Sequence, residues 1–211
     1  MKKTERQLIT AFLLLCMAFL SAIFAVQGSL LTSMIDNFHL DPSRQGLANS
    51  MAFLGGILAL AGAFSLQGRW KKRTLLKIAV VICAAGLIVM WAAKSYTLYV
   101  AGWFITGFGL GLMDTLLSAC MADLYTGRMA VIMMCILHTA YGLSSVLSPM
   151  GYAAMLNSGM LWQRIYLVIA LAGLLILLGA FIVKKAGNIT DGEVLSAKAL
   201  SPKEILPALH K

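Results

Sequence analysis

Asp114 is the acidic residue that lies deepest in an uncharged stretch of this 211-residue chain. Between 96 and 125 the only charged residues are Asp114 and Asp123. An acid inside a membrane-crossing helix costs a few kcal/mol, so it usually faces a water-filled pathway where it can take up and release a proton. We therefore expect Asp114 to bind a solute and to couple its movement to protons. The alternative is a structural carboxyl held neutral by a neighbouring helix.

Three neutral polar residues, Gln27, Asn49 and His138, lie in other apolar stretches. Amide and imidazole groups surrounded by lipid need hydrogen-bond partners inside the protein. Each of the three either faces a bound solute or bonds to a neighbouring helix. We take all three as candidate substrate-binding residues.

No pattern in the sequence predicts catalysis, a metal site or a cofactor. No serine lies at a spacing that would pair it with a base, and no motif suits nucleotide phosphates. The cysteines lack C-x-x-C spacing and fall inside apolar runs, which indicates packing residues; they are Cys16, Cys83, Cys120 and Cys135. We therefore predict a protein that is not an enzyme and that holds no cofactor.

The composition indicates a membrane protein. Apolar residues make up 60% of the chain and charged residues 12%, with a mean hydropathy of +0.86. A soluble core of this size cannot bury so much apolar surface. The net charge of +9 does not indicate nucleic-acid binding, because no soluble domain is left to carry a basic face.

Charge-free runs predict an all-α membrane protein with six transmembrane helices. The expected spans are 8–35, 45–67, 74–93, 96–125, 129–155 and 162–183, which form a bundle over residues 1–185. Residues 186–211 are expected to form a cytoplasmic linker, in which Ser201-Pro202-Lys203-Glu204 predicts the start of an amphipathic helix. The first uncharged run is longer than the core of a signal peptide, so we interpret it as a retained helix.

The basic residues predict the orientation of the chain. Of seventeen Lys and Arg residues, all but Arg44, Lys94 and Arg164 fall on the side of the N-terminus. The positive-inside rule then places both termini in the cytoplasm, with the chain crossing the cell (inner) membrane.

A basic turn at 68–73 joins the second and third spans. It is either a topology anchor or part of a cytoplasmic gate. Such a gate would also include Asp123, at the end of the fourth span, and Arg128, at the start of the fifth. The candidate gate residues are Gln67, Arg69, Lys71, Lys72, Arg73, Asp123 and Arg128.

The fourth span shows two further patterns. It carries small residues that allow close helix packing in lipid, namely Gly102, Gly107, Gly109 and Gly111. It also aligns with the first span at a single offset, which pairs Gln27 with Asp114, Leu30 with Leu117, Met34 with Met121 and Asp36 with Asp123. Because these two spans run in opposite directions, the alignment favours two inverted three-helix repeats.

Together these features resemble the N-terminal six-helix half of a major facilitator superfamily transporter. The family signature between its second and third helices reads approximately G-x-L-A-D-R-x-G-R-K-x-x-L, and this chain has QGRWKKRTLL there. Gln67 replaces the acid of the signature and Trp70 replaces its second glycine. Asp123 and Arg128 resemble the acid and the basic partner that follow the family's fourth helix.

Within the superfamily, GFGLGLMD ending at Asp114 and LHTAYG containing His138 resemble the fucose and glucose/galactose permease branch. That branch often carries Asn where Ser118 stands, so Ser118 joins the candidate binding residues. The resemblance implies secondary transport of a sugar or related solute by alternating access, coupled to protons or sodium.

The likeness covers residues 8–185, which is half of such a transporter. It implies a second six-helix half as partner, besides membrane lipid, a small-molecule substrate and a coupling ion, with no nucleic acid. One alternative is a half-size transporter that pairs with another copy of itself. Another is the six-helix substrate-capture subunit of an ATP-driven vitamin importer.

Overall fold

The computed structural model describes residues 3–66 and 70–183, which form eight helices. They are α1 (Lys3–Ser29), α2 (Leu31–Phe38), α3 (Pro42–Gln45), α4 (Leu47–Leu66), α5 (Lys72–Trp91), α6 (Tyr96–Leu124), α7 (Gly127–Asn157) and α8 (Trp162–Val183). Six of these helices are long and apolar enough to cross a membrane. The prediction of an all-α protein with six spans is confirmed. The predicted linker at 186–211 lies outside the described residues.

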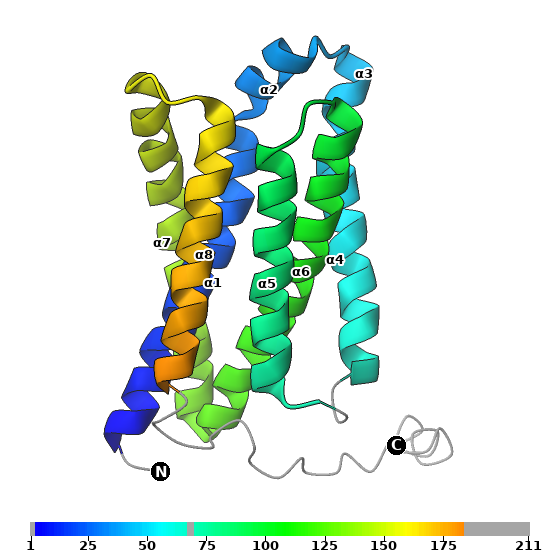
Figure 1. Ribbon diagram of the computed structural model, residues 1–211. Helices are drawn as coiled ribbons and strands as arrows, with labels where there is room; N and C mark the ends of the chain where they lie inside the picture. The colour runs from blue at the N-terminus through cyan, green and yellow to red at the C-terminus, as the bar shows by residue number, and fades with distance from the viewer. Residues whose placement is uncertain (1–2, 67–69, 184–211) are drawn as a thin grey trace.

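The six long helices run side by side in alternating directions (Figure 1). α1 begins and α8 ends at one end of the bundle, which we call the N-terminal end. The short helices α2 and α3 lie at the opposite end, which we call the α2–α3 end. Ser95 begins α6 as its N-cap, with the side chain accepting a hydrogen bond from the Leu98 N–H. Gly127 and Gly159 supply the positive φ angles that the turns around α7 require.

The helix contacts follow a two-fold pattern. α6 packs against α4 and α5, α1 packs against α7, and α5 packs against α8. The six spans are α1, α4, α5, α6, α7 and α8 in chain order. If α1 is exchanged with α6, α4 with α7 and α5 with α8, the α4–α6 pair becomes the α7–α1 pair. The same exchange returns the α5–α8 pair to itself, and it turns the close α5–α6 pair into the looser contact between α8 and α1. Two inverted three-helix repeats produce this arrangement.

Glycine backbones hold α6 against both of its neighbours. A Cβ built on Gly107 would lie 2.7 Å from the Cα of Ala52 on α4, and one on Gly111 would lie 2.7 Å from the carbonyl oxygen of Gly56. On the α5 side, a Cβ on Gly109 would lie 2.6 Å from the Sγ of Cys83. Real Cβ atoms do not approach so closely, so glycine is required for the helices to lie at this distance.

Hydroxyl groups hold α1 against α7. Ser21 donates a hydrogen bond to the carbonyl of Tyr141 at 2.8 Å, and Ser144 donates to that of Ala18 at 2.7 Å. Tyr152 donates to the carbonyl of Ala22 at 2.8 Å. Only Leu137 and Tyr152 of α7 are buried, although Met133, Met134 and Met155 also pack against the core. This helix is therefore joined to the bundle by one packed face and a line of side-chain to backbone bonds.

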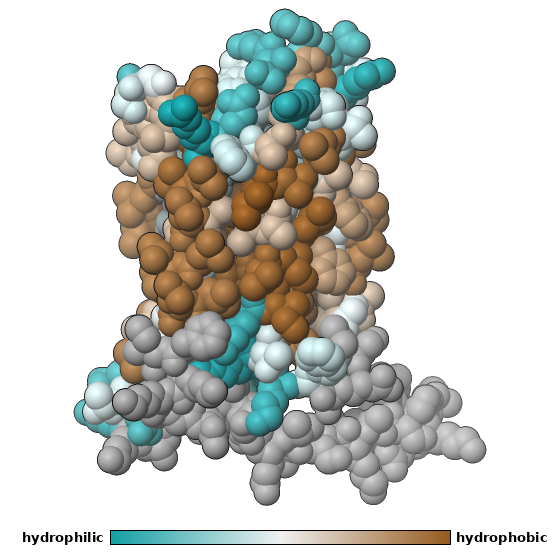
Figure 2. Space-filling model, in the orientation of Figure 1, coloured by the Kyte–Doolittle hydropathy of each residue, from teal (hydrophilic) through white to brown (hydrophobic). Residues whose placement is uncertain are grey.

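The surface is divided as a membrane requires. On the face shown in Figure 2, an apolar band crosses the middle of the bundle, and hydrophilic residues gather at the α2–α3 end, with others visible near the opposite end. Exposed apolar side chains on the membrane-crossing helices, such as Ile57, Val146 and Leu175, therefore face lipid or another membrane-embedded chain.

Candidate functional site

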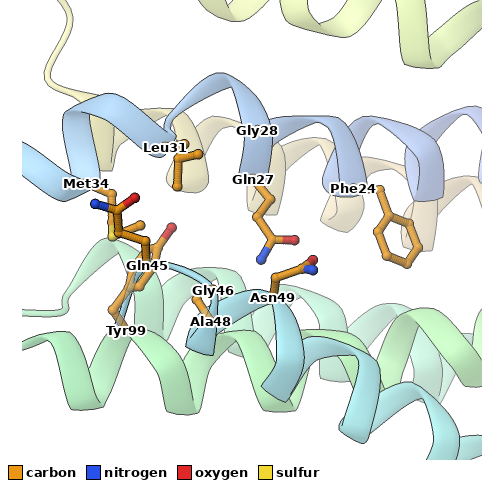
Figure 3. Close-up of a pocket in the computed structure, with 10 residues that line it drawn as sticks. All are labelled: Phe24, Gln27, Gly28, Leu31, Met34, Gln45, Gly46, Ala48, Asn49 and Tyr99. Carbon is orange, nitrogen blue, oxygen red and sulfur yellow. The ribbon is translucent and has the colours of Figure 1, made fainter. Parts of the chain in front are cut away.

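A cavity of about 430 Å³ opens near the α2–α3 end, between α1–α2, α3–α4 and α6. Its lining residues are Phe24, Gln27, Gly28, Leu31, Met34, Gln45, Gly46, Ala48, Asn49 and Tyr99. Three of these carry side-chain amides, and none of the ten is charged. We call this cavity the amide pocket. In Figure 3 the side chains of Gln27 and Asn49 point toward each other across it.

The helical repeat explains one wall of the amide pocket. Phe24, Gln27, Gly28 and Leu31 follow one another at spacings of three, one and three residues, which places them on one face of α1 and its continuation α2. The facing wall begins at Gln45, the last residue of α3, and continues through Gly46 into α4. A Cβ built on Gly28 or Gly46 meets no atom within 4 Å. These two glycines therefore leave the pocket open.

Tyr99 forms the third wall, in the first turn of α6. Its hydroxyl lies 2.7 Å from that of Tyr166 on α8, and its ring contacts Phe38 and Trp162. These contacts belong to a ring cluster made of Phe38, Tyr96, Tyr99, Trp103, Trp162 and Tyr166. Because the cluster joins α2, α6 and α8, it fixes this wall, while α1, α3 and α4 supply the amides.

Asp114 and His138 form a second polar site, from α6 and α7. Both side chains are exposed on the bundle surface, and they lie close enough for an electrostatic interaction between them. Neither residue lines the amide pocket. Asp114 follows Tyr99 by fifteen residues on the same helix, which corresponds to roughly 22 Å at 1.5 Å per residue. We call Asp114 and His138 the charged pair.

The five candidate binding residues thus separate into two groups. Gln27 and Asn49 come together in the amide pocket, and Asp114 and His138 come together in the charged pair. Ser118 is half-buried and lies one turn beyond Asp114, close to the same face of α6. It does not line the amide pocket.

The candidate gate residues lie at the N-terminal end. Lys72 Nζ lies 2.5 Å from Asp123 Oδ2, an ion pair that joins the start of α5 to the end of α6. Lys71 and Arg73 flank Lys72, and Arg128 is exposed in the first turn of α7. Gln67 and Arg69 lie outside the described residues.

Of the ten lining residues of the amide pocket, only Gln27 and Asn49 were predicted from the sequence. Phe24, Gln45 and Tyr99 are the largest of the side chains that were missed. The three-residue spacing of Phe24 and Gln27 could have indicated that the two side chains share one face of a helix. Gln45 stood at the edge of an expected span, where polar residues are ordinary. Among the described residues, no group of three His, Cys, Asp or Glu side chains could hold a metal ion.

Residues 13–207 match the family model of the Major Facilitator Superfamily. No match to a curated protein was found. The xylose transporter XylE from E. coli, in an inward open conformation, is similar in structure with a TM-score of 0.71 and 20% identity, over 96% of this chain and 55% of that one. The human organic anion transporter MFSD10 (TETRAN) gives a TM-score of 0.66 and 16% identity, over 87% of this chain and 48% of that one.

A third solved structure is a bacterial homologue of the human lysosomal transporter Spinster, in an inward-facing and unoccupied conformation. It gives a TM-score of 0.66 and 15% identity, over 89% of this chain and 44% of that one. This chain therefore spans about half the length of each solved structure. At these identities the likeness establishes the fold, which is the N-terminal half of the transporter fold.

Proposed function

Because the chain belongs to the Major Facilitator Superfamily, we propose that it moves a small polar solute across a membrane by ion-coupled secondary transport. It would act as the N-terminal six-helix half of the transporter, with both termini in the cytoplasm and the α2–α3 end outside. The skewed distribution of Lys and Arg supports this orientation. Cysteines placed at Asp41 and at Trp70 would test it, since only the first should react with an impermeant maleimide added outside.

The observation that carries this proposal is the charged pair. Asp114 is exposed on the side of an apolar helix, next to His138. A carboxyl at this depth is costly against lipid, and a second six-helix half placed against this surface would enclose it in a wet cavity. Alternating access also needs two bundles that rock against each other.

The substrate would be a sugar or related compound, as the motifs around Asp114 and His138 suggest for the fucose and glucose/galactose permease branch. Asp114 would carry the coupling proton. Gln27, Asn49, Ser118 and His138 would offer hydrogen bonds to the solute. Lys72 and Asp123, with Lys71, Arg73 and Arg128 nearby, would belong to a cytoplasmic gate that opens once per cycle.

The decisive experiment replaces Asp114 by Asn in the assembled transporter, purified with its membrane partner and reconstituted in vesicles. Asp114→Asn keeps the shape of the side chain and removes its titration. We expect proton-driven accumulation of the solute to be lost and exchange of solute across the membrane to continue, because exchange needs no net proton movement.

Asp36→Asn is the matched control, since Asp36 is an exposed acid at the α2–α3 end. It should accumulate solute as the unmodified protein does. Accumulation by Asp114→Asn with an unchanged pH dependence would contradict the coupling role. The partner that copurifies decides between the two assemblies: a different six-helix chain supports the half-transporter, whereas only this chain supports a dimer of half-size proteins.

A further inference from the structure

The amide pocket differs in chemistry from the charged pair. Its polar side chains are Gln27, Gln45 and Asn49, together with the Tyr99 hydroxyl that is already bonded to Tyr166. Within residues 3–66 and 70–183, none of the three amides forms a side-chain hydrogen bond to another residue. Their donors and acceptors are therefore open to water or to a bound molecule.

The geometry of the helices explains why the cavity persists. α1 packs on α7 and α4 packs on α6, so α1 and α4 make little contact with each other near Gln27 and Asn49. Gly28 and Gly46 place no side chain in the space between them. The volume of about 430 Å³ lies within the range of roughly 300–1,000 Å³ that small-molecule sites occupy.

The lining selects the class of ligand. Each amide offers a carbonyl acceptor and two N–H donors, which together match the hydroxyl groups of a polyol. A charged solute would lose its hydration here without meeting an opposite charge, at a high cost in free energy. Phe24 and Tyr99 flank the amides in Figure 3 and offer apolar surface to the C–H groups of a sugar ring.

We propose that the amide pocket is a recognition site of its own for a neutral polyhydroxylated solute, about 20 Å along α6 from the charged pair. The proposal rests on the proposed transport function and adds to it that recognition and proton coupling occur at separate places in this half. The solute would bind to the amides near the α2–α3 end, and it would meet Ser118 and His138 separately, as it passes Asp114.

The test measures binding to the full chain in lipid nanodiscs by saturation-transfer difference NMR. The solutes are D-glucose and myo-inositol, which are neutral, and D-gluconate and D-glucosamine, which match glucose in size but carry opposite charges. We expect binding of the two neutral solutes and none of the charged ones. Gln27→Leu and Asn49→Leu should each weaken glucose binding about tenfold, the effect of one lost hydrogen bond of ordinary strength.

Gly28→Leu places a side chain in the pocket at a position where an added Cβ meets no atom within 4 Å, and it should abolish glucose binding. Gly151→Leu is its matched control, because a Cβ on Gly151 of α7 also meets nothing within 4 Å. It should bind glucose normally. Melting temperatures of both variants check that each is folded.

Three outcomes would overturn the proposal: equal binding of gluconate or glucosamine, no binding of either neutral solute, and glucose binding that persists in Gly28→Leu. Glucose binding that disappears in Asp114→Asn would merge the two sites and also overturn it. The coupling role is judged separately, by accumulation in Asp114→Asn vesicles. Either idea can therefore fail while the other stands.

Discussion

The α4–α6 and α1–α7 interfaces occupy equivalent places in the two repeats, yet they are held together by different chemistry. α4 and α6 meet backbone to backbone at Gly107 and Gly111, which lie against Ala52 and Gly56. α1 and α7 meet through hydroxyl groups that bond to backbone carbonyls across the interface. The same topology therefore supports one interface fixed by close packing and one fixed by hydrogen bonds.

The difference between close packing and hydrogen bonding indicates which helix can move. Close packing of two backbones is lost as soon as either one shifts, because van der Waals contact falls off over fractions of an ångström. A hydroxyl group can exchange its hydrogen bond to one backbone carbonyl for a bond to another carbonyl along the helix, with little net change in free energy. α6, whose buried residues extend from Tyr99 to Leu124, is thus the more firmly held helix, and α7 is better suited to shift along α1 in the proposed transport cycle.

The largest effect is expected where packing is closest. Gly107→Leu places a side chain on the backbone of Ala52 and should lower the free energy of unfolding by about 3 kcal/mol, the upper part of the range for an overpacked core. Unfolding by SDS in mixed micelles measures this loss. Gly151→Leu on α7, where an added Cβ meets no atom within 4 Å, should change stability little. Equal losses in both variants would show that glycine does not distinguish the two interfaces.

An intermediate effect is expected at the hydroxyl-bonded interface. Interhelical hydrogen bonds in membrane proteins contribute about 0.6 kcal/mol each on average. The combined variant Ser21→Ala, Ser144→Ala and Tyr152→Phe should therefore lose about 2 kcal/mol in the same assay. Ser145→Ala is the control, because Ser145 bonds only to Gly142 of its own helix. A loss as large as that of Gly107→Leu would contradict the adaptable α1–α7 interface.

The smallest effect on stability is expected from the ion pair between Lys72 and Asp123. It bridges α5 and α6, whose packing already depends on Gly86, Gly102 and Gly109. Both side chains are partly exposed, and such pairs contribute at most about 1 kcal/mol. Asp123→Asn should thus unfold within 1 kcal/mol of the unmodified chain. A larger loss would mean that charge, rather than glycine packing, holds this side of the bundle.

Much of the fold could be predicted from the sequence because its causes are local along the chain. Uninterrupted apolar runs gave six spans, and the glycines of the fourth span marked the helix that packs most closely. The break at Leu30, where α1 passes into α2, was not predictable in this way. Leu30 is apolar and fully buried, so hydropathy continues across the break.

The sequence predicted which polar residues belong to the candidate sites, but it did not predict how they are grouped in space. Polar side chains in apolar runs identified Gln27, Asn49, Asp114 and His138, because lipid makes each of them costly without a function or a partner. Their division into two places about 20 Å apart depends on the helical rise between Tyr99 and Asp114 and on which helices touch. A tyrosine near the end of a span usually marks the membrane interface, so nothing in the sequence pointed to Tyr99 as a pocket wall.

The ring cluster gives the chain an optical signature. Trp103 and Trp162 are buried within it, whereas Trp70 and Trp91 are exposed. The fluorescence therefore comes from two populations, one in an apolar environment and one that aqueous or lipid-borne quenchers can reach. Because Trp162 contacts Tyr99, the buried population lies next to the wall of the amide pocket. Emission that quenchers leave intact is thus a built-in reporter of events at that wall.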